Sequence, residues 1–362
     1  MTMNKIELAT EQLLAIYRQA SQELLLKAVE ASARNAKGSA AYYRSLWAQV
    51  EDKIRILDMA VGSYSKQVIP LAYSYGVNEA VKGLLHLGLR AKGYDAFQKL
   101  HESSIKILVE NLNDNLIEAN HLMGRRVKDE WRRAQLEAIT RKQATGETWK
   151  QTQKSFTEQV AEKGLGSFKD SMGRVWQIDR YAEMVSRSVT REATNSGLMA
   201  QLTSLGYDLV QMSSHSSPCP ICAPLEGRVY SISGESKDYP KLDKAFGEYA
   251  NIHPYCKHVL LPYVPELDEN VKQTKELSNR PFDIDPRTKN KINVYNAKQT
   301  AARWQRATEK QWWQYKQRLG DVPSLKKFAE MKKADNEQYK QLQARYKSAG
   351  TYQKQAASAK EV

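Results

Sequence analysis

Cysteine is scarce in this sequence, and long apolar runs are missing from it. The 362 residues include three cysteines, which cannot form a closed set of disulfides. No run of about 18 apolar residues occurs, so we expect no membrane-spanning helix. The first residues, Met-Thr-Met-Asn-Lys-Ile-Glu, lack an apolar signal core, so we expect no secretion by that route. Together these absences favour reduced thiols in a cytosolic setting.

Proline is also nearly absent from residues 1–145, where Pro70 is the only one. Apolar side chains such as Leu13 and Tyr17 recur there at helical spacing. We therefore expect three or four long helices in a bundle or extended array. The expected breaks between them are marked by glycine, at Gly38, Gly62 and Gly93.

The remaining chain divides into three further segments. Residues 146–206 predict a helical connector that ends at Gly206. Residues 207–267 predict a small β-rich module, because the periodicity changes to short runs typical of strands, at 207–212, 227–232 and 259–264. Residues 268–362 predict a basic helical tail with helices near 291–318 and 323–348. The predicted fold is thus mainly α, with a small α+β module.

The positive charge of the chain is concentrated in its last quarter. The net charge is +14, and residues 271–362 contain 21 Lys and Arg against 9 Asp and Glu, so that this segment carries +12 of it. A basic segment joined to a nearly neutral body favours a polyanionic partner, most simply nucleic acid. The alternative interpretation is a solvated helical surface that is merely rich in Lys.

The three cysteines and three of the six histidines lie together between residues 215 and 258. Cys219 and Cys222 have the Cys-x-x-Cys spacing that lets two thiolates reach one zinc ion. Cys256 lies in the second half of the cluster, His-Pro-Tyr-Cys-Lys-His. We expect these three cysteines to be zinc ligands.

The fourth predicted ligand is a histidine, either His258 or His253, with His258 favoured. His215 is a candidate for a supporting position beside the ligands. Four protein ligands close the coordination shell, so the expected zinc is structural and stabilises a module too small for a large core. The alternative is that these side chains are unmetallated core residues.

Two enzymatic interpretations compete with a structural zinc. Pro-Cys-x-x-Cys matches half of the zinc deaminase signature, but no upstream His-x-Glu supplies the proton shuttle. A metal-dependent nuclease of the His-Asn-His kind would be expected to contain two Cys pairs, and the chain has one. We therefore expect no enzyme, and a metal-dependent nuclease or another DNA-acting enzyme remains the alternative.

The cluster also resembles the head morphogenesis and minor capsid proteins of tailed bacteriophages. The resemblance rests on three stretches within residues 178–265, namely Cys-Pro-Ile-Cys, Leu-Glu-Gly-Arg-Val-Tyr and His-Pro-Tyr-Cys-Lys-His. The Mu protein F-like family commonly ends the motif in Cys-x-Cys, whereas this chain has Cys256-Lys257-His258. In this respect the sequence is more similar to the phage minor capsid protein 2 family.

That resemblance implies a structural virion protein present in few copies. It implies association with the portal protein and the capsid proteins, in the capsid interior or at the portal vertex, and residence in the host cytoplasm during assembly. It also implies a role in head assembly and in DNA packaging or ejection. With the charge distribution, this makes packaged DNA the expected partner of the basic tail.

Overall fold

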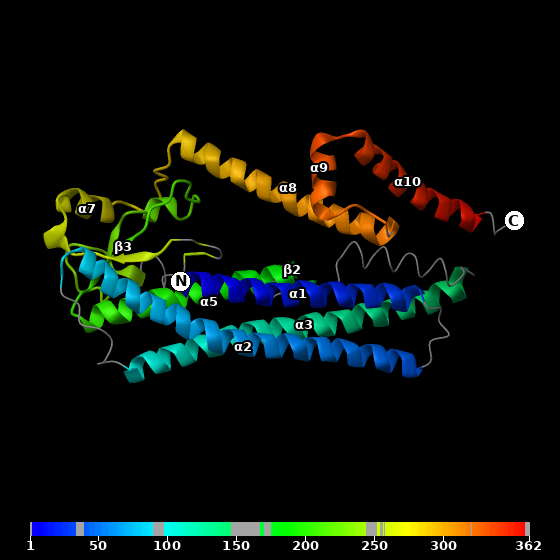
Figure 1. Ribbon diagram of the computed structural model, residues 1–362, viewed down its shortest axis with the longest axis horizontal. Coiled ribbons are helices and arrows are strands. Elements are labelled where there is room, and N and C mark those ends of the chain that lie inside the picture. Colours follow the sequence, from blue (N-terminus) through cyan, green and yellow to red (C-terminus); the bar gives the residue numbers. More distant parts are fainter. Residues whose placement is uncertain are drawn as a thin grey trace.

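The computed structural model describes residues 2–33, 40–89, 98–145, 167–169, 175–243, 252–253, 256, 258–319 and 321–358. The protein is mainly helical, with a small three-stranded antiparallel sheet. Figure 1 shows long helices side by side along the long axis, the sheet at one end, and α8, α9 and α10 along one side. The long helices are α1 (Thr2–Ala33), α2 (Ala40–His86), α3 (Gln98–Thr145) and α5 (Ile178–Ser204).

The predicted break at Gly62 is wrong, because α2 runs without interruption through both Gly62 and Pro70. Apolar side chains on both sides of Gly62 are buried in the bundle core, including Leu57, Val61 and Val68. A glycine within a helix costs about 1 kcal/mol relative to alanine, which the burial of these side chains readily offsets. The other two expected breaks, at Gly38 and Gly93, lie outside the described residues.

Two glycines let α5 cross α2 at close range. A Cβ at Gly76 of α2 would lie 1.9 Å from the carbonyl oxygen of Thr194, and a Cβ at Gly197 of α5 would lie 2.2 Å from that of Tyr73. No side chain fits at such distances, so the two backbones touch directly. Although α5 follows the bundle helices by more than 30 residues, it completes their core, which Val185 and Ala193 enter.

Two sets of strands interrupt the helices. A hairpin of β1 (Ser167–Lys169) and β2 (Val175–Gln177), which was not predicted, pairs Phe168 with Trp176 just before α5. The three-stranded sheet has the order β4–β3–β5 and is formed by β3 (Leu209–Met212), β4 (Val229–Ser231) and β5 (Leu260–Pro262). All three of its strands fall within the stretches predicted as strands.

The sheet lies against the ends of two bundle helices. Its core contains Val210 and Tyr230 together with Leu84 of α2 and Leu202 of α5. A Cβ at Gly83 would come within 2.6 Å of the Pro262 ring, so β5 approaches α2 closely. The bundle thus provides the platform on which the sheet and its loops are built.

The C-terminal helices have a small apolar cluster of their own. After the short α7 (Val271–Ser278), α8 (Lys289–Leu319) packs against α9 (Leu325–Ala334) and α10 (Glu337–Ser358) through Tyr315, Phe328 and Tyr339. The helix predicted over 323–348 is split, because Asp335 adopts a left-handed conformation (φ 46°) and ends α9. Within the described parts of the chain, no helix is long and apolar enough to cross a bilayer.

Candidate metal centre

The sheet brings the two halves of the cysteine and histidine cluster together. Residues beyond β3 and residues before β5 are adjacent, because Ser213 N donates to Val259 O at 3.0 Å in continuation of the β3–β5 pairing. Cys222 caps the short 3-10 helix Ala223–Leu225, and its backbone N–H donates to Cys219 Sγ at 3.3 Å. The first half is therefore a tight turn that directs two sulfur atoms toward the second half.

Five donor atoms converge at this point, in two overlapping groups of three that share Cys222. In the first group, His253 Nε2 lies 3.2 Å from Cys219 Sγ and 3.0 Å from Cys222 Sγ. In the second group, Cys256 Sγ lies 3.6 Å from Cys222 Sγ and 3.4 Å from His258 Nδ1. The structure therefore brings together all five side chains that the sequence predicted as metal ligands.

The distance between Cys222 Sγ and Cys256 Sγ is close to that expected around one tetrahedral metal ion. Sulfur ligands at about 2.3 Å from zinc and at a tetrahedral angle are about 3.8 Å apart, close to the distance between Cys222 and Cys256. All three cysteines are free thiols. Three sulfur donors and an imidazole form a soft, nitrogen-containing set, which suits zinc better than the oxygen-seeking calcium or magnesium.

The two histidines differ in their surroundings. His258 is buried, and while its Nδ1 faces Cys256, its Nε2 lies 2.8 Å from Glu226 Oε1. Metal-bound imidazoles usually donate their second ring N–H to such a carboxylate, which fixes the tautomer. His253 is half-buried and lies between the sulfur atoms of Cys219 and Cys222. The carboxylate partner distinguishes His258, while the number of short sulfur contacts distinguishes His253.

His215 contacts the cluster at its edge. Its ring is exposed and stands perpendicular to that of His258, with 4.3 Å between the ring centroids. Its backbone N–H donates to Glu226 Oε1 at 2.7 Å, so one carboxylate connects both histidines. Its ring nitrogens belong to neither donor group. The structure thus places His215 beside the candidate ligands.

Cys222 and Cys256 strongly shift each other's pKa. The hydrogen bond between Cys222 and Cys256 lowers the pKa of Cys256 to about 3 and raises the pKa of Cys222 far above its usual range. Burial lowers the pKa of His258, but its hydrogen bonds to Cys256 and Glu226 outweigh this and raise it. The pocket thus favours a thiolate at Cys256, and a thiolate is the form in which cysteine binds metal.

Arg191 brings a buried positive charge to this cluster from α5. Its side chain donates from Nη1 to Cys256 O at 2.6 Å, and the residue is only 8% exposed. Burial lowers its pKa, while the nearby sulfur atoms of Cys256 and Cys222 act in the opposite direction. Three thiolates around a bound dication would leave one net negative charge, which the nearby Arg191 would offset.

Arg191 and Glu226 were not among the predicted site residues. Glu226 lies in the Leu-Glu-Gly-Arg stretch, four residues beyond Cys222, but an isolated acid has no spacing that indicates a role. Arg191 is 28 residues before Cys219 and on another element. Only the packing of α5 beneath the sheet brings it to the sulfur atoms.

The segment that leads into α8 is fastened to the same turn. Arg287 donates from Nη1 to Pro218 O at 3.3 Å, and Lys298 donates from Nζ to Ser217 Oγ at 2.6 Å. Nearer the sheet, Arg228 of the loop before β4 donates to Pro281 O at 2.9 Å and lies over the Phe282 ring. The start of α8 therefore rests on the residues that precede Cys219.

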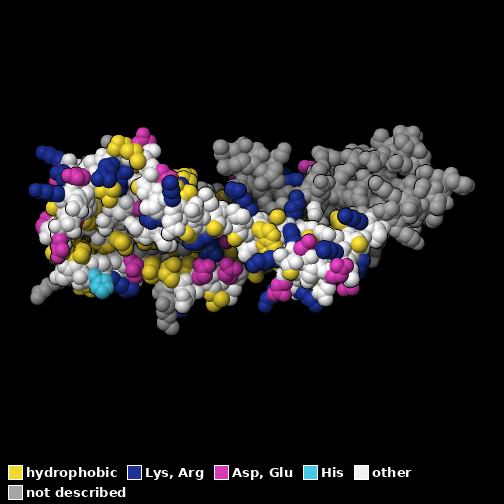
Figure 2. Space-filling view, turned by 90° about the horizontal axis from the view of Figure 1, so that it is seen from above, with side chains coloured by type: hydrophobic (Ala, Val, Ile, Leu, Met, Phe, Trp, Pro, Cys, Tyr) yellow, Lys and Arg dark blue, Asp and Glu magenta, His cyan; other side chains and the backbone are white. Residues whose placement is uncertain are grey.

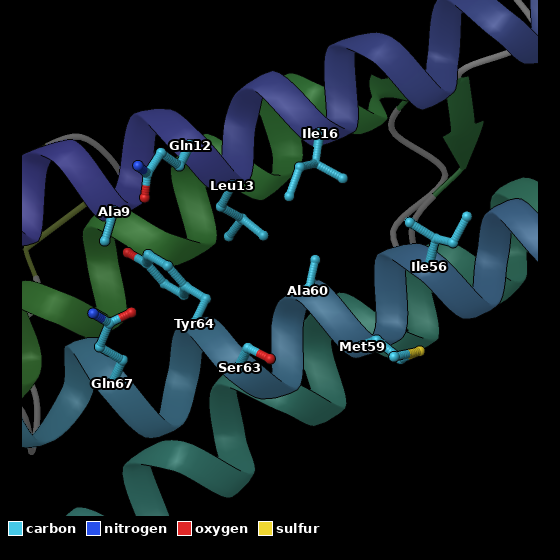
Figure 3. Close-up of a pocket in the computed structure, with 10 residues that line it drawn as sticks. All are labelled: Ala9, Gln12, Leu13, Ile16, Ile56, Met59, Ala60, Ser63, Tyr64 and Gln67. Carbon is cyan, nitrogen blue, oxygen red and sulfur yellow. The ribbon is translucent and has the colours of Figure 1, made fainter.

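A separate groove lies between α1 and α2, away from the cysteines. It encloses about 390 Å³, and Figure 3 shows Ile16, Ile56, Met59 and Tyr64 around it. None of its lining residues is charged, and Tyr64 is hydrogen-bonded to Thr10 at 2.8 Å. The groove is therefore mostly apolar and is lined by no charged side chain.

Comparison with known protein families identifies a match for this chain. A family model described as phage minor capsid protein 2 matches residues 1–349, which is nearly the whole chain. No curated protein and no solved structure matches the chain. The match includes the cluster at residues 215–258 as well as the helices on both sides of it.

Proposed function

Because the chain belongs to the phage minor capsid protein 2 family, a family of structural capsid proteins, we propose that it acts at the portal vertex of a tailed phage. In this proposal it joins the portal protein to the inner face of the capsid and acts in head assembly and in DNA packaging or ejection. The family gives the chain a structural role in the phage head and agrees with the resemblance found in the sequence.

The zinc ion in this proposal is structural. The observation that supports it most directly is the convergence of three cysteines and two histidines, with Cys222 and Cys256 spaced as tetrahedral zinc requires. Cys219, Cys222 and Cys256 would supply three ligands. We propose His258 as the fourth ligand. Its Nε2 faces the carboxylate of Glu226, and metal-bound histidines usually have such a carboxylate at their second ring nitrogen. The zinc would stabilise the fold by closing the two halves of the cluster on one ion.

The remaining parts of the chain fit the same role. We propose that residues 1–145 and 146–206 form the helical body, 207–267 the zinc module, and 268–362 a basic tail that touches packaged DNA. The tail carries most of the net positive charge, and phosphates are the partners that such a charge attracts without regard to sequence. The body supplies the surface for the portal and capsid proteins.

The experiment that tests the metal begins with protein purified without chelator. Elemental analysis should find one zinc per chain, and a chelator should lower the melting temperature. Absence of stoichiometric zinc would contradict the metal centre while leaving the family membership intact. Co-purification with the portal protein of the same phage, co-expressed from neighbouring genes, tests the proposed location.

The nuclease alternative makes a different prediction for the same residues. A catalytic metal would give metal-dependent DNA cleavage that His253→Ala or His258→Ala abolishes without unfolding the chain. A structural metal gives no turnover, and loss of the true ligand destabilises the sheet. Comparing DNA cleavage with thermal melting for the two variants separates these functions and identifies the fourth ligand.

A further inference from the structure

Helix α8 has three distinct faces, and two of them are occupied. The first face packs against α9 and α10 through Trp312 and Tyr315, and Thr308, one turn earlier on the same face, is buried. The second face meets the body of the protein, where Lys298 donates to Ser217 and Glu309 pairs with Arg180 at 3.3 Å. Lys298 and Glu309 are 11 residues apart, which is three turns of the helix, so they share one face.

The third face carries cations and amides. Arg303, Arg306 and Lys310 stand at positions i, i+3 and i+7, and Asn296 and Gln299 extend the same line toward the start of the helix. We call these five residues the α8 stripe. Arg303, Arg306 and Lys310 are exposed, and none of them forms an ion pair with any residue that the structure describes.

Acidic side chains are excluded from this face. Of the 31 residues of α8, eight are Lys or Arg, and Glu309 is the single acid. Glu309 is turned toward the body and paired with Arg180, so it does not offset the charge of the stripe. Figure 2, which looks down on the side of the molecule that carries α8, shows Lys and Arg side chains scattered over that side, with Asp and Glu side chains between them.

We propose that the α8 stripe is the surface that binds the phosphate backbone of double-stranded DNA, an inference that rests on the proposed function of the tail. The three cations extend over about 10 Å of helix, and duplex DNA presents one phosphate per about 1.7 Å of its axis. Several phosphates can therefore meet the stripe at once. Asn296 and Gln299 add side-chain donors of the kind that bind phosphate oxygens.

The composition of the stripe favours DNA over an acidic protein. Protein interfaces depend on a central cluster of buried aromatic or apolar anchors, and here such side chains lie on the face already packed against α9 and α10. Lys and Arg contacts to phosphates carry no sequence information, so binding should be indifferent to base sequence. That property suits a protein that meets a whole packaged genome.

The test measures DNA binding of the full-length protein by fluorescence anisotropy in a salt series, with a short duplex of random sequence. Replacing the three cations together, Arg303→Gln, Arg306→Gln and Lys310→Gln, keeps the helix propensity nearly unchanged. The slope of log affinity against log salt should become shallower by about 2.7, because each neutralised phosphate contributes about 0.9.

The matched control is Lys326→Gln, Lys327→Gln and Lys333→Gln on α9, which removes the same charge from exposed lysines. We expect this control to change the slope by less than about 1. An equal change of the slope in both triple variants would contradict the proposal that the α8 stripe binds DNA. It would indicate that DNA is attracted to the charge of the whole tail. An acidic polypeptide that displaces the duplex at equal charge concentration would overturn the proposal in favour of a protein partner. Salt-independent or absent DNA binding by the unaltered protein would contradict both the α8 stripe proposal and the proposed contact between the tail and DNA. The proposed zinc site and portal association would not be affected by that result.

Discussion

The helical bundle and the sheet module are stabilised in different ways. Among the residues that the structure describes, the bundle buries 27 apolar side chains in one cluster that four long helices share. The module has strands of three or four residues, and its cluster of 11 buried side chains borrows Ala80, Leu84, Leu198 and Leu202 from α2 and α5. Burial of apolar side chains can stabilise the bundle by itself. The module depends both on apolar contacts with α2 and α5 and on the cysteine and histidine cluster.

The largest expected effect comes from removing the metal. Structural zinc supplies on the order of 10 kcal/mol to small zinc modules, which is more than three short strands can replace. We predict that chelation, or Cys222→Ser with zinc present, exposes the backbone amides of β3, β4 and β5 to hydrogen exchange. The amides in the middle of α2 should stay protected, and far-UV circular dichroism should change little.

The same experiment also tests whether the bundle and the module are stabilised independently of each other. Zinc added back to the chelated protein should restore protection of the strands, but not in Cys222→Ser. If the strands stay protected without metal, the borrowed apolar contacts are sufficient for the module. If α2 loses protection together with the strands, the two regions fold as one cooperative unit.

The close crossing of α2 and α5 allows a second test, on the bundle side. Gly76→Ala would place a Cβ against a backbone oxygen that cannot move aside alone, so we expect a loss of about 3 kcal/mol in unfolding free energy. Gly62→Ala is the matched control in the same helix, because no atom lies within 4 Å of its Cβ position. The control should gain about 0.5–1 kcal/mol from reduced chain entropy.

Chemical denaturation followed by circular dichroism measures both glycine variants. Zinc content should remain at the unaltered level in each, since neither residue lies near the cysteines. A Gly76→Ala protein as stable as the unaltered one would show that the helices separate at low cost. That result would weaken the view that packing alone holds the bundle.

The third test concerns the partners of the metal ligands. Glu226→Ala removes the carboxylate that holds His258, and such partners contribute about 10–100-fold to metal affinity. His215→Ala removes a ring that only contacts His258, so we expect less than a twofold change in affinity. Competition with a chromophoric chelator measures both variants. Equal losses would indicate that His215 is itself a ligand.

Local patterns in the sequence were sufficient to predict both the long helices and the cysteine cluster. Helical spacing and Cys-x-x-Cys spacing are properties of neighbouring residues, and α1, β3 and the turn at Cys219 follow them. The continuity of α2 through Gly62 was not predictable in this way, because it depends on burial against other helices. Local propensity at one glycine is weak compared with that burial.

Contacts between residues far apart in the chain could not be predicted from the sequence either. Tyr17 donates to Asn120 at 2.9 Å, and Asn120 donates to Asp58 at 2.8 Å, which links three helices through buried and half-buried polar groups. Arg191 contacts Cys256 from α5 because that helix packs beneath the sheet. Such partners are separated by dozens of residues, and no periodicity indicates them.

The smallest expected effect concerns the ion pairs at the edge of the bundle. Arg187 of α5 donates to Glu7 at 3.0 and 3.1 Å and also reaches Glu11 of α1 and Glu183 of its own helix. These carboxylates raise the pKa of Arg187, led by its hydrogen bond to Glu7. The groups are partly exposed, so we expect Arg187→Gln to cost about 1 kcal/mol at low salt and less at high salt. Arg55→Gln is the control, because its pair with Asp52 is more exposed and lies within one helix. Denaturation at two salt concentrations measures the unfolding free energy of both variants. If salt does not reduce the loss of stability in Arg187→Gln, the packing of Arg187 against α1, and not its charge, holds the two helices together.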